Sequence, residues 1–228
     1  MSTIAENIAK VGERIREAAQ ASGRDLNSIG LLAVSKTKPS AAVREAFAAG
    51  LRDFGENYLQ EALEKQVELS DLPLIWHFIG PIQSNKTKPI AEHFAWVHSV
   101  DRLKVAQRLS EQRPVSLPPL NICLQVNVSL EPSKSGCAPD ELTALALAVS
   151  QLPNLCLRGL MAIPEPTDDV AAQRAAFARL RELRDGLPMP LDTLSMGMSH
   201  DLDAAIAEGA TWVRIGTALF GARDYSNA

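Results

Sequence analysis

Residues 29–39, IGLLAVSKTKP, decide how this chain folds and where its chemistry lies. The run up to residue 35 is apolar or small, which predicts a buried strand that ends in a lysine. Side chains alternate along a strand, so Leu32, Val34 and Lys36 share one face. Loss of hydration lowers the pKa of a lysine amine, and a neutral amine is a nucleophile suited to Schiff-base formation. The alternative is that the Lys36 stem lies along apolar surface while its ammonium group reaches water.

Short apolar runs of the same kind recur along the chain and alternate with longer amphipathic segments. They predict eight strands, at residues 29–35, 51–55, 74–79, 96–100, 121–127, 156–162, 193–196 and 212–215. Helices are expected between them, for example at residues 40–49, 56–69, 84–94, 101–112, 139–152 and 168–185. Eight strand–helix units in 228 residues match a (β/α)8 TIM barrel, an α/β fold whose usual size is about 250 residues. An open doubly wound sheet is the alternative, but no GxGxxG motif follows the first strand.

An additional helix is predicted before the first strand. Apolar residues recur at helical spacing between Ile4 and Ile15. Thr3 and Glu6 form a capping-box pattern at the start, and Gly23 is a suitable end. A chain of 228 residues leaves little room for a second domain, so we expect residues 1–228 to form one barrel domain with an extra N-terminal helix.

The composition argues against several classes of function. Net charge is −4 and the basic residues are scattered, which matches neither a nucleic-acid footprint nor a membrane-surface helix. The three cysteines, Cys123, Cys137 and Cys156, form no CxxC pair, and the histidines show no metal-ligand spacing. The first residues lack the basic and apolar segments of a signal peptide. We therefore expect a cytoplasmic protein without a metal, membrane or nucleic-acid partner, and the scattered surface charge favours a monomer.

Glycine and hydroxyl residues gather after the last two predicted strands. Gly197 with Ser199, and Gly216 with Thr217, each offer flexible backbone N–H groups and a hydroxyl shortly before a helix. In TIM barrels the loops after strands seven and eight are the usual phosphate site. We therefore expect these two loops to bind a phosphate group, although each alone is equally compatible with a glycine turn and a helix cap.

Two further polar side chains lie within predicted strands. Arg214 interrupts the apolar run 212–215, and because a guanidinium keeps its proton it requires an acceptor. An acidic side chain such as Asp192 or Asp203 would serve, as would a ring nitrogen of a bound ligand. His77, on the third strand, is either a structural histidine or a ligand contact, and the sequence leaves both open.

Seven motifs in order along the chain resemble those of one protein family. They are AVSKTKP at 33–39, GENY at 55–58 with Gln60 and Glu61, HFIGPIQSNK at 77–86, QVNV at 125–128, RGLMAIP at 158–164, LSMGMSHD at 194–201 and VRIGTALFG at 213–221. Over residues 4–223 the chain is similar to the pyridoxal phosphate homeostasis proteins. That family resembles the barrel domain of fold-type III enzymes that use pyridoxal 5'-phosphate (PLP), such as alanine racemase, without their second, β-rich domain.

The resemblance implies a cofactor and the residues that hold it. Lys36 would form an internal aldimine with PLP, and Arg214 would face the pyridine nitrogen. The other residues that would contact PLP are Asn57 near the ring, His77 and Met196 along the pocket, and Ser199, Gly216 and Thr217 at the phosphate.

Arg214 and the resemblance together favour a carrier over a catalyst. An arginine does not give its proton to the pyridine nitrogen, so the ring stays uncharged and is a poorer electron sink. The chain also stops shortly after the eighth predicted strand, so we expect no second domain to supply a tyrosine base. The resemblance implies a role in intracellular PLP (vitamin B6) homeostasis, with indirect effects on amino-acid homeostasis and transient contacts with apo-enzymes that take up PLP.

Two enzyme functions are the alternatives. A slow PLP-dependent amino-acid racemase would need two bases on opposite faces of its substrate, of which Lys36 supplies one and the other is unassigned. A barrel aldolase would use Lys36 without PLP, and its phosphate loops would hold a sugar phosphate. An aldolase of this kind would be colourless when purified, whereas a PLP protein would be yellow.

Overall fold

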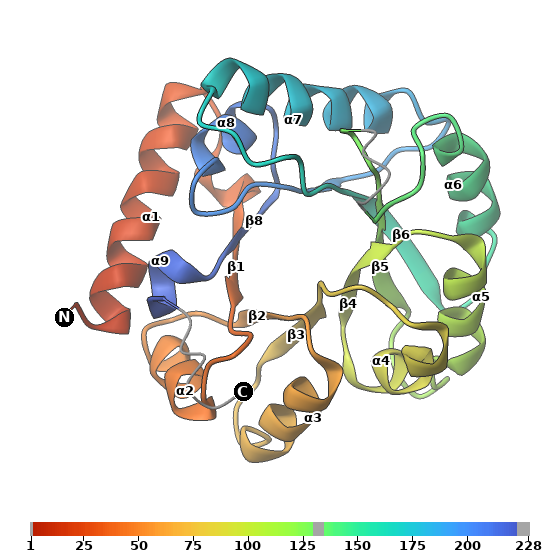
Figure 1. The fold of residues 1–228 in the computed structure, drawn as a ribbon. Coiled ribbons are helices and arrows are strands. Elements are labelled where there is room, and N and C mark those ends of the chain that lie inside the picture. The colour runs from red at the N-terminus through yellow and green to blue at the C-terminus, as the bar shows by residue number, and fades with distance from the viewer. Residues whose placement is uncertain (1, 130–134, 223–228) are drawn as a thin grey trace.

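Eight parallel strands close into a barrel at the centre of the molecule, as Figure 1 shows in a view along the barrel axis. This computed structural model describes residues 2–129 and 135–222 of the chain. The strands are β1 (Gly30–Val34), β2 (Asp53–Glu56), β3 (Ile75–Phe78), β4 (Trp96–Val100), β5 (Leu120–Gln125), β6 (Leu155–Met161), β7 (Thr193–Ser195) and β8 (Trp212–Ile215). Each pairs with the next in sequence order, and β8 closes the ring against β1. The predicted TIM barrel is therefore confirmed.

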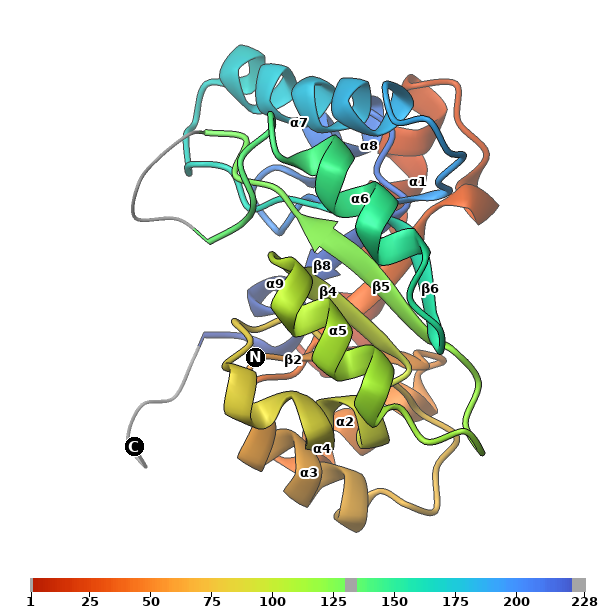
Figure 2. The same ribbon diagram turned by 90° about the vertical axis from the view of Figure 1, so that its right-hand side faces the viewer.

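Helices surround the barrel and occupy most of the connections between strands (Figures 1 and 2). They are α1 (Ile4–Ala21), α2 (Ser40–Ala48), α3 (Leu59–Glu68), α4 (Thr87–His93), α5 (Leu103–Gln112), α6 (Leu142–Ser150), α7 (Val170–Asp185), α8 (Leu202–Ala207) and α9 (Thr217–Phe220), with short 3-10 turns η1 (Leu26–Ser28) and η2 (Ser84–Lys86). The extra N-terminal helix α1 lies against α8 and α9, near the place where β8 meets β1. Within the described residues, no helix combines the length and apolar character needed to cross a membrane.

The start and end of α1 follow from its local sequence. Thr3 Oγ1 accepts a hydrogen bond from the N–H of Glu6, and the Glu6 carboxylate accepts one from the N–H of Thr3. This is the predicted capping box. The helix ends at Ala21, shortly before Gly23, whose φ of 63° lies in the left-handed region that glycine adopts readily.

The helices predicted at 56–69 and 139–152 each begin three residues later than their sequence patterns indicate, and the first of these delays bears on the site. Glu56 is the last residue of β2, and α3 begins only at Leu59 rather than at residue 56. The backbone of Glu56 lies beside that of Phe78 in β3, and its side chain is fully buried. A buried carboxylate requires bonding partners, and those partners lie next to the candidate site described below.

Apolar side chains form two separate groups in this fold. The larger group fills the layer between the strands and the surrounding helices. The smaller group lies inside the barrel and consists of Leu32, Val34 and Ile79, with Trp212 packed against it. Arg214 shares this interior face because it lies directly beside Leu32 in the neighbouring strand. The barrel interior therefore contains buried polar side chains whose partners matter for the site.

Candidate functional site

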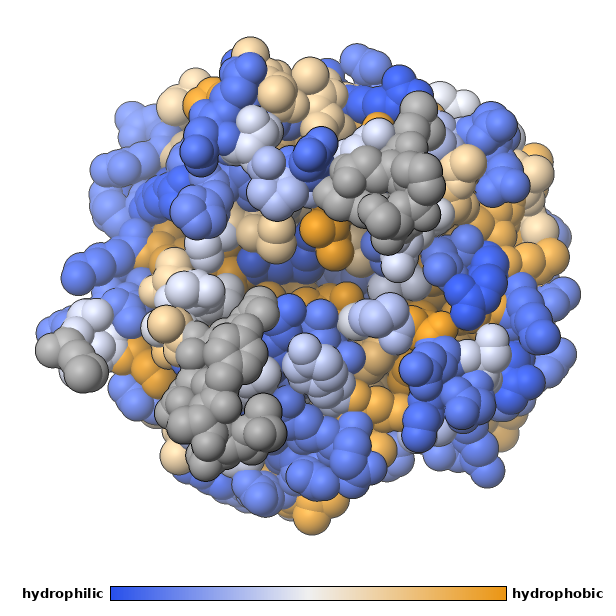
Figure 3. Space-filling view, viewed as in Figure 1, coloured by the Kyte–Doolittle hydropathy of each residue, from blue (hydrophilic) through white to orange (hydrophobic). Residues whose placement is uncertain are grey.

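The carboxyl ends of the strands surround a cavity of about 400 Å³. Figure 3 views the molecule from this side and shows its surface hollowed near the centre. The walls come from β1 and β8 and from the loops after β1, β2, β3, β6, β7 and β8. Six of the eight predicted site residues line the cavity: Lys36, Asn57, Ser199, Arg214, Gly216 and Thr217. A cavity of this size suits a small cofactor.

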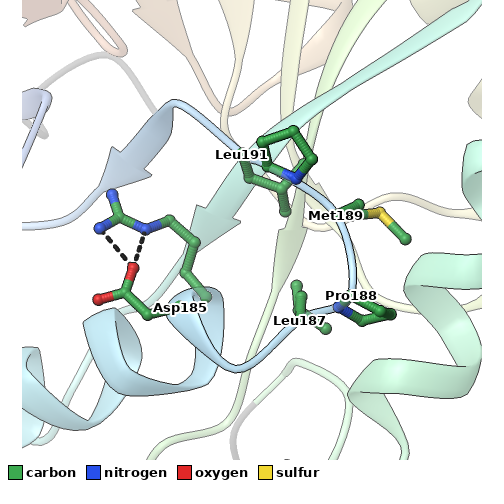
Figure 4. Close-up of a pocket in the computed structure, with 7 residues that line it drawn as sticks. Asp185, Leu187, Pro188, Met189 and Leu191 are labelled. Carbon is green, nitrogen blue, oxygen red and sulfur yellow. Dashed lines mark hydrogen bonds and ion pairs between the residues drawn. The ribbon is translucent and has the colours of Figure 1, made fainter.

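A second hollow lies at the amino ends of the strands, in the loop that joins α7 to β7 (Figure 4). It is lined by Leu187, Met189 and Leu191 together with the ion pair between Arg184 and Asp185. None of the predicted site residues lines this hollow. The cavity at the carboxyl ends is therefore the candidate site.

Lys36 follows β1 and begins a tight turn at the edge of the cavity. The next residue, Thr37, has a φ of 63°, in the left-handed region that β-branched residues rarely adopt. Its N–H donates to Glu61 Oε1 at 2.6 Å. The N–H of Lys38 donates to the carbonyl oxygen of Ser35 at 3.0 Å. The structure thus maintains a strained backbone beside the lysine, and strain of this kind concentrates at functional sites.

Behind this turn lies a group of charged side chains, Glu56, Glu61 and Lys65, which we call the ion cluster. Lys65 Nζ donates to Glu56 Oε1 at 2.8 Å and to Glu61 Oε1 at 2.5 Å. It also donates to the carbonyl oxygen of Ser35 at 2.7 Å, and Ser35 Oγ donates to Glu56 Oε1 at 2.6 Å. Burial raises the pKa of the Glu56 carboxyl, and the ion pair with Lys65 opposes that rise. The ion cluster ties β1, β2 and α3 together directly behind Lys36.

Arg214 reaches the cavity from the barrel interior. It donates to Ser195 Oγ and to the carbonyl oxygen of Ala162, each at 2.9 Å. The acidic partners that the sequence suggested are engaged elsewhere, because Asp192 pairs with Arg158 and Asp203 pairs with Arg14. Burial lowers the pKa of the Arg214 guanidinium to about 10, so it remains a cation at neutral pH. It is thus a buried cation, and the hydrogen bonds its guanidinium makes within the described residues go to neutral oxygens.

The structure places two of the predicted residues away from the cavity. His77 is fully buried inside the barrel, where Nε2 lies 3.0 Å from Asp53 Oδ1 and Nδ1 lies 2.9 Å from His98 Nε2. Its ring stacks on Trp96 with 5.5 Å between the ring centroids. Met196 is buried in the apolar layer that packs against the helices. Neither residue lines the cavity, so of the two interpretations of His77 the structure favours the structural one.

The groups in the cavity fit a small phosphate ester that carries an aldehyde. Asn57 Oδ1 is buried, and the described residues offer it no hydrogen-bond donor, so it can accept one from a ligand. A Cβ at Gly216 would lie 3.2 Å from the carbonyl oxygen of Val34, so the closely packed loop there favours glycine. Ser199 and Thr217, both of which carry a hydroxyl, line the same cavity. Together with the amine of Lys36, this donor set matches the chemistry of PLP.

The sequence prediction missed one wall of the cavity. The loop after β6 contributes residues 163, 164 and 166–168, and Gln173 of α7 and His200 of the loop after β7 also face the cavity. The sequence did contain a signal for the loop after β6, because the RGLMAIP motif ends at Pro164. Loops that follow barrel strands surround the opening at the carboxyl ends of the strands.

Comparisons with known proteins agree with the fold and the site. The chain matches the family described as alanine racemase, N-terminal domain, over residues 3–224. It is 82% identical to the pyridoxal phosphate homeostasis protein of Pseudomonas aeruginosa, with 99% of this chain and 98% of that protein covered. The protein of the same name from Escherichia coli strain K12 is 53% identical, with 99% of each covered.

Solved structures also resemble this chain in fold. PipY of Synechococcus elongatus with PLP bound has a TM-score of 0.83 and 45% identity, and the match covers 96% of this chain and 100% of that chain. An alanine racemase from Clostridium difficile has a TM-score of 0.70 but 12% identity, and the match covers 95% of this chain and 58% of that chain. This second similarity concerns the fold alone.

The fold and the lysine-containing cavity define a barrel of the alanine racemase N-terminal type. Within that class, the chain belongs to the family of pyridoxal phosphate homeostasis proteins. The family resemblance seen in the sequence motifs is thereby confirmed.

Proposed function

We propose that this protein binds PLP covalently through Lys36 and acts as a PLP carrier in vitamin B6 homeostasis. The observation that carries the proposal is the single cavity shared by Lys36, Arg214 and the buried oxygen of Asn57. PLP supplies an aldehyde that condenses with a lysine amine to a Schiff base, with loss of one water molecule. The name of the 82% identical relative and the PLP bound to PipY support this assignment.

The remaining cavity residues have distinct roles in the proposal. The hydroxyls of Ser199 and Thr217, with the backbone at Gly216, would hold the phosphate. Arg214 would face the ring acceptor, because a guanidinium donates hydrogen bonds and accepts none. Asn57 Oδ1 would accept a hydrogen bond from the bound molecule.

Spectrophotometric titration with PLP tests this proposal. The wild-type protein should develop a visible absorption band, and Lys36→Ala should not. Lys38→Ala is the matched control, because Lys38 is two residues away and its Nζ donates to the carbonyl oxygen of Ala222, outside the cavity. An equal visible band in Lys36→Ala would contradict the assignment. A colourless wild-type protein that also fails to bind added PLP would favour the barrel aldolase.

We further propose that the bound cofactor is carried rather than used in turnover. The support is Arg214, which reaches the cavity and keeps its proton. A ring nitrogen facing it would stay unprotonated, and the ring would be a weak electron sink. The second candidate function, a slow amino-acid racemase, is kept because His200 lines the cavity and would be its second base.

Deuterium exchange separates the carrier from the racemase. The holoprotein is incubated with single-enantiomer amino acids in deuterated water, beside free PLP at the same concentration. A carrier incorporates α-deuterium no faster than free PLP does. Faster incorporation that disappears in His200→Ala would establish the racemase instead.

The carrier proposal extends to its partners. We propose that residues 1–228 act as one cytoplasmic, monomeric domain that hands PLP to apo-enzymes. The cysteines at positions 123, 137 and 156 are free thiols, which is usual for a reducing compartment. Mixing the holoprotein with an apo-enzyme should restore its activity at a rate different from that given by equimolar free PLP. Sedimentation equilibrium should give a mass near the 24.6 kDa of one chain.

A further inference from the structure

A continuous run of hydrogen bonds crosses the barrel interior from Arg214 to Asp53. We call Asp53, His77, His98, Ser195 and Arg214 the histidine chain. Arg214 donates to Ser195 Oγ at 2.9 Å, and Ser195 Oγ lies 2.7 Å from His98 Nδ1. The chain continues through His98 Nε2 to His77 Nδ1 at 2.9 Å and through His77 Nε2 to Asp53 Oδ1 at 3.0 Å. One end therefore lies in the cofactor cavity, and the other lies at the amino end of β2.

The two ends of the histidine chain decide where every proton in it lies. A carboxylate only accepts, so His77 Nε2 carries the proton and donates to Asp53. A neutral His77 then accepts at Nδ1, which requires His98 to donate from Nε2 and to accept at Nδ1. His98 Nδ1 therefore accepts a hydrogen bond from the hydroxyl of Ser195. Arg214 only donates, so it donates to a lone pair of Ser195 Oγ. Every hydrogen bond in the histidine chain is then donated in the same direction, from Arg214 toward Asp53.

The surroundings of His77 and His98 shield the two imidazoles from solvent. Both imidazoles are fully buried, and the ring of His77 is stacked on Trp96 and lies edge-on to Trp212. Burial lowers the pKa of His77 and places that of His98 well below its ordinary value, with the nearby charge of Arg214 adding to the effect on His98. Both rings are therefore neutral, as the assignment of protons requires.

We propose that the histidine chain is a positioning device for Arg214, in which His98 fixes the Ser195 hydroxyl and Ser195 in turn fixes the guanidinium toward the cavity. This inference rests on the proposed function in one respect, namely that Arg214 faces the bound cofactor ring. Ser195 and His98 are positioning residues, because they act on the ligand only through Arg214. The negative charge of Asp53 sets the direction of the chain from the far end of the barrel.

Nitrogen-15 NMR of the ligand-free protein tests the proton assignment directly. We expect two imidazoles that are neutral and protonated at Nε2, with no titration between pH 8 and pH 6. His93 is exposed and provides a reference signal from an imidazole outside the barrel interior. A proton at Nδ1 of either buried ring, or an imidazolium in this range, would overturn the proposal. This measurement does not depend on PLP binding.

A pair of substitutions at His98 tests the positioning role. His98→Leu removes both hydrogen bonds, whereas an amide oxygen in His98→Asn can still accept from Ser195 at the former Nδ1 position. We expect His98→Leu to bind PLP about tenfold more weakly and to shift the visible absorption maximum of the holoprotein. His98→Asn should restore most of the affinity and the wild-type maximum. Leu109→Ala, in the buried layer around the barrel, controls for lost stability without touching the chain.

Each outcome decides the proposal. Equal PLP affinity and equal spectra for wild type and His98→Leu would show that the position of Arg214 does not depend on the histidine chain. Equal losses of PLP affinity in His98→Leu and His98→Asn would assign the effect to packing rather than to the hydrogen-bond acceptor for Ser195. If the wild-type protein binds no PLP, the proposed function fails, while the NMR result still decides the proton assignment.

Discussion

The ion cluster and the histidine chain are two groups of buried polar side chains, and they are built differently. The ion cluster lies outside the ring of strands, against α3, and places the full charges of Lys65 and Glu56 in contact. The histidine chain lies inside the ring, and its middle members are neutral. Its charges are confined to the ends, at the half-buried Asp53 and at Arg214.

The difference reflects what each group must hold in place. The ion cluster fixes the backbone turn after Lys36 through the bond from Thr37 to Glu61. Charges in contact suit this task because they bond three elements at one point. The histidine chain fixes the direction of one side chain, Arg214, over several ångströms. Neutral rings suit that task because additional charges inside the barrel would require counter-ions there.

Breaking the ion cluster should have the largest effect on stability. Lys65→Met leaves Glu56 buried without a cation, and loss of one partner of a buried pair costs about 3–5 kcal/mol. Urea unfolding followed by circular dichroism measures the change. Arg44→Met, which breaks the exposed pair with Asp71, is the control and should leave the unfolding curve unchanged within error. If Lys65→Met lowers the free energy of unfolding no more than Arg44→Met does, the ion cluster does not hold the turn after Lys36.

Breaking the histidine chain should have a somewhat smaller effect. His98→Leu leaves Ser195 Oγ and His77 Nδ1 without their partner, which should cost about 2–4 kcal/mol in the free energy of unfolding. His98→Asn should recover part of that loss. The same urea series measures both variants. Equal stability of wild type and His98→Leu would show that the interior bonds contribute nothing.

Acid should weaken the histidine chain without any substitution. His77 and His98 stay neutral when folded, whereas the unfolded chain protonates them near pH 6.5, so the unfolded state binds more protons below that pH. The free energy of unfolding should therefore fall as the pH drops, by roughly 1 kcal/mol per imidazole between pH 7 and pH 5.5. His98→Asn should show a smaller slope than the wild type, because one buried neutral imidazole is removed. Stability that rises over this range would contradict the neutral assignment.

The smallest expected effect concerns the strained turn beside Lys36. Thr37 has a φ of 63°, which asparagine tolerates better than a β-branched residue does. Thr37→Asn should therefore raise the free energy of unfolding by about 0.5–1 kcal/mol. Thermal unfolding of the ligand-free protein detects a change of this size. A destabilised Thr37→Asn would show that the threonine side chain contributes more than its backbone strain costs.

The sequence predicted the fold more completely than it predicted the site. The apolar strand just before Lys36 and the alternation of elements were sufficient for the barrel, because each depends on local patterns. The interior contacts were not predictable, since His98 and Ser195 are 97 residues apart and meet only through the strand register. Arg214 shows the limit most clearly, because the protein partners suggested by its chemistry were carboxylates, with a ligand ring nitrogen as the alternative. The barrel supplies a hydroxyl and a carbonyl oxygen instead.

Reduction followed by peptide mass mapping tests whether Lys36 is the residue that holds PLP. The protein is loaded with PLP, reduced with borohydride, digested and analysed by mass spectrometry. We expect the mass of the reduced cofactor on the peptide that contains Lys36, with Lys38 and Lys65 unmodified. Cofactor mass distributed over surface lysines, with the Lys36 peptide unchanged, would contradict that assignment.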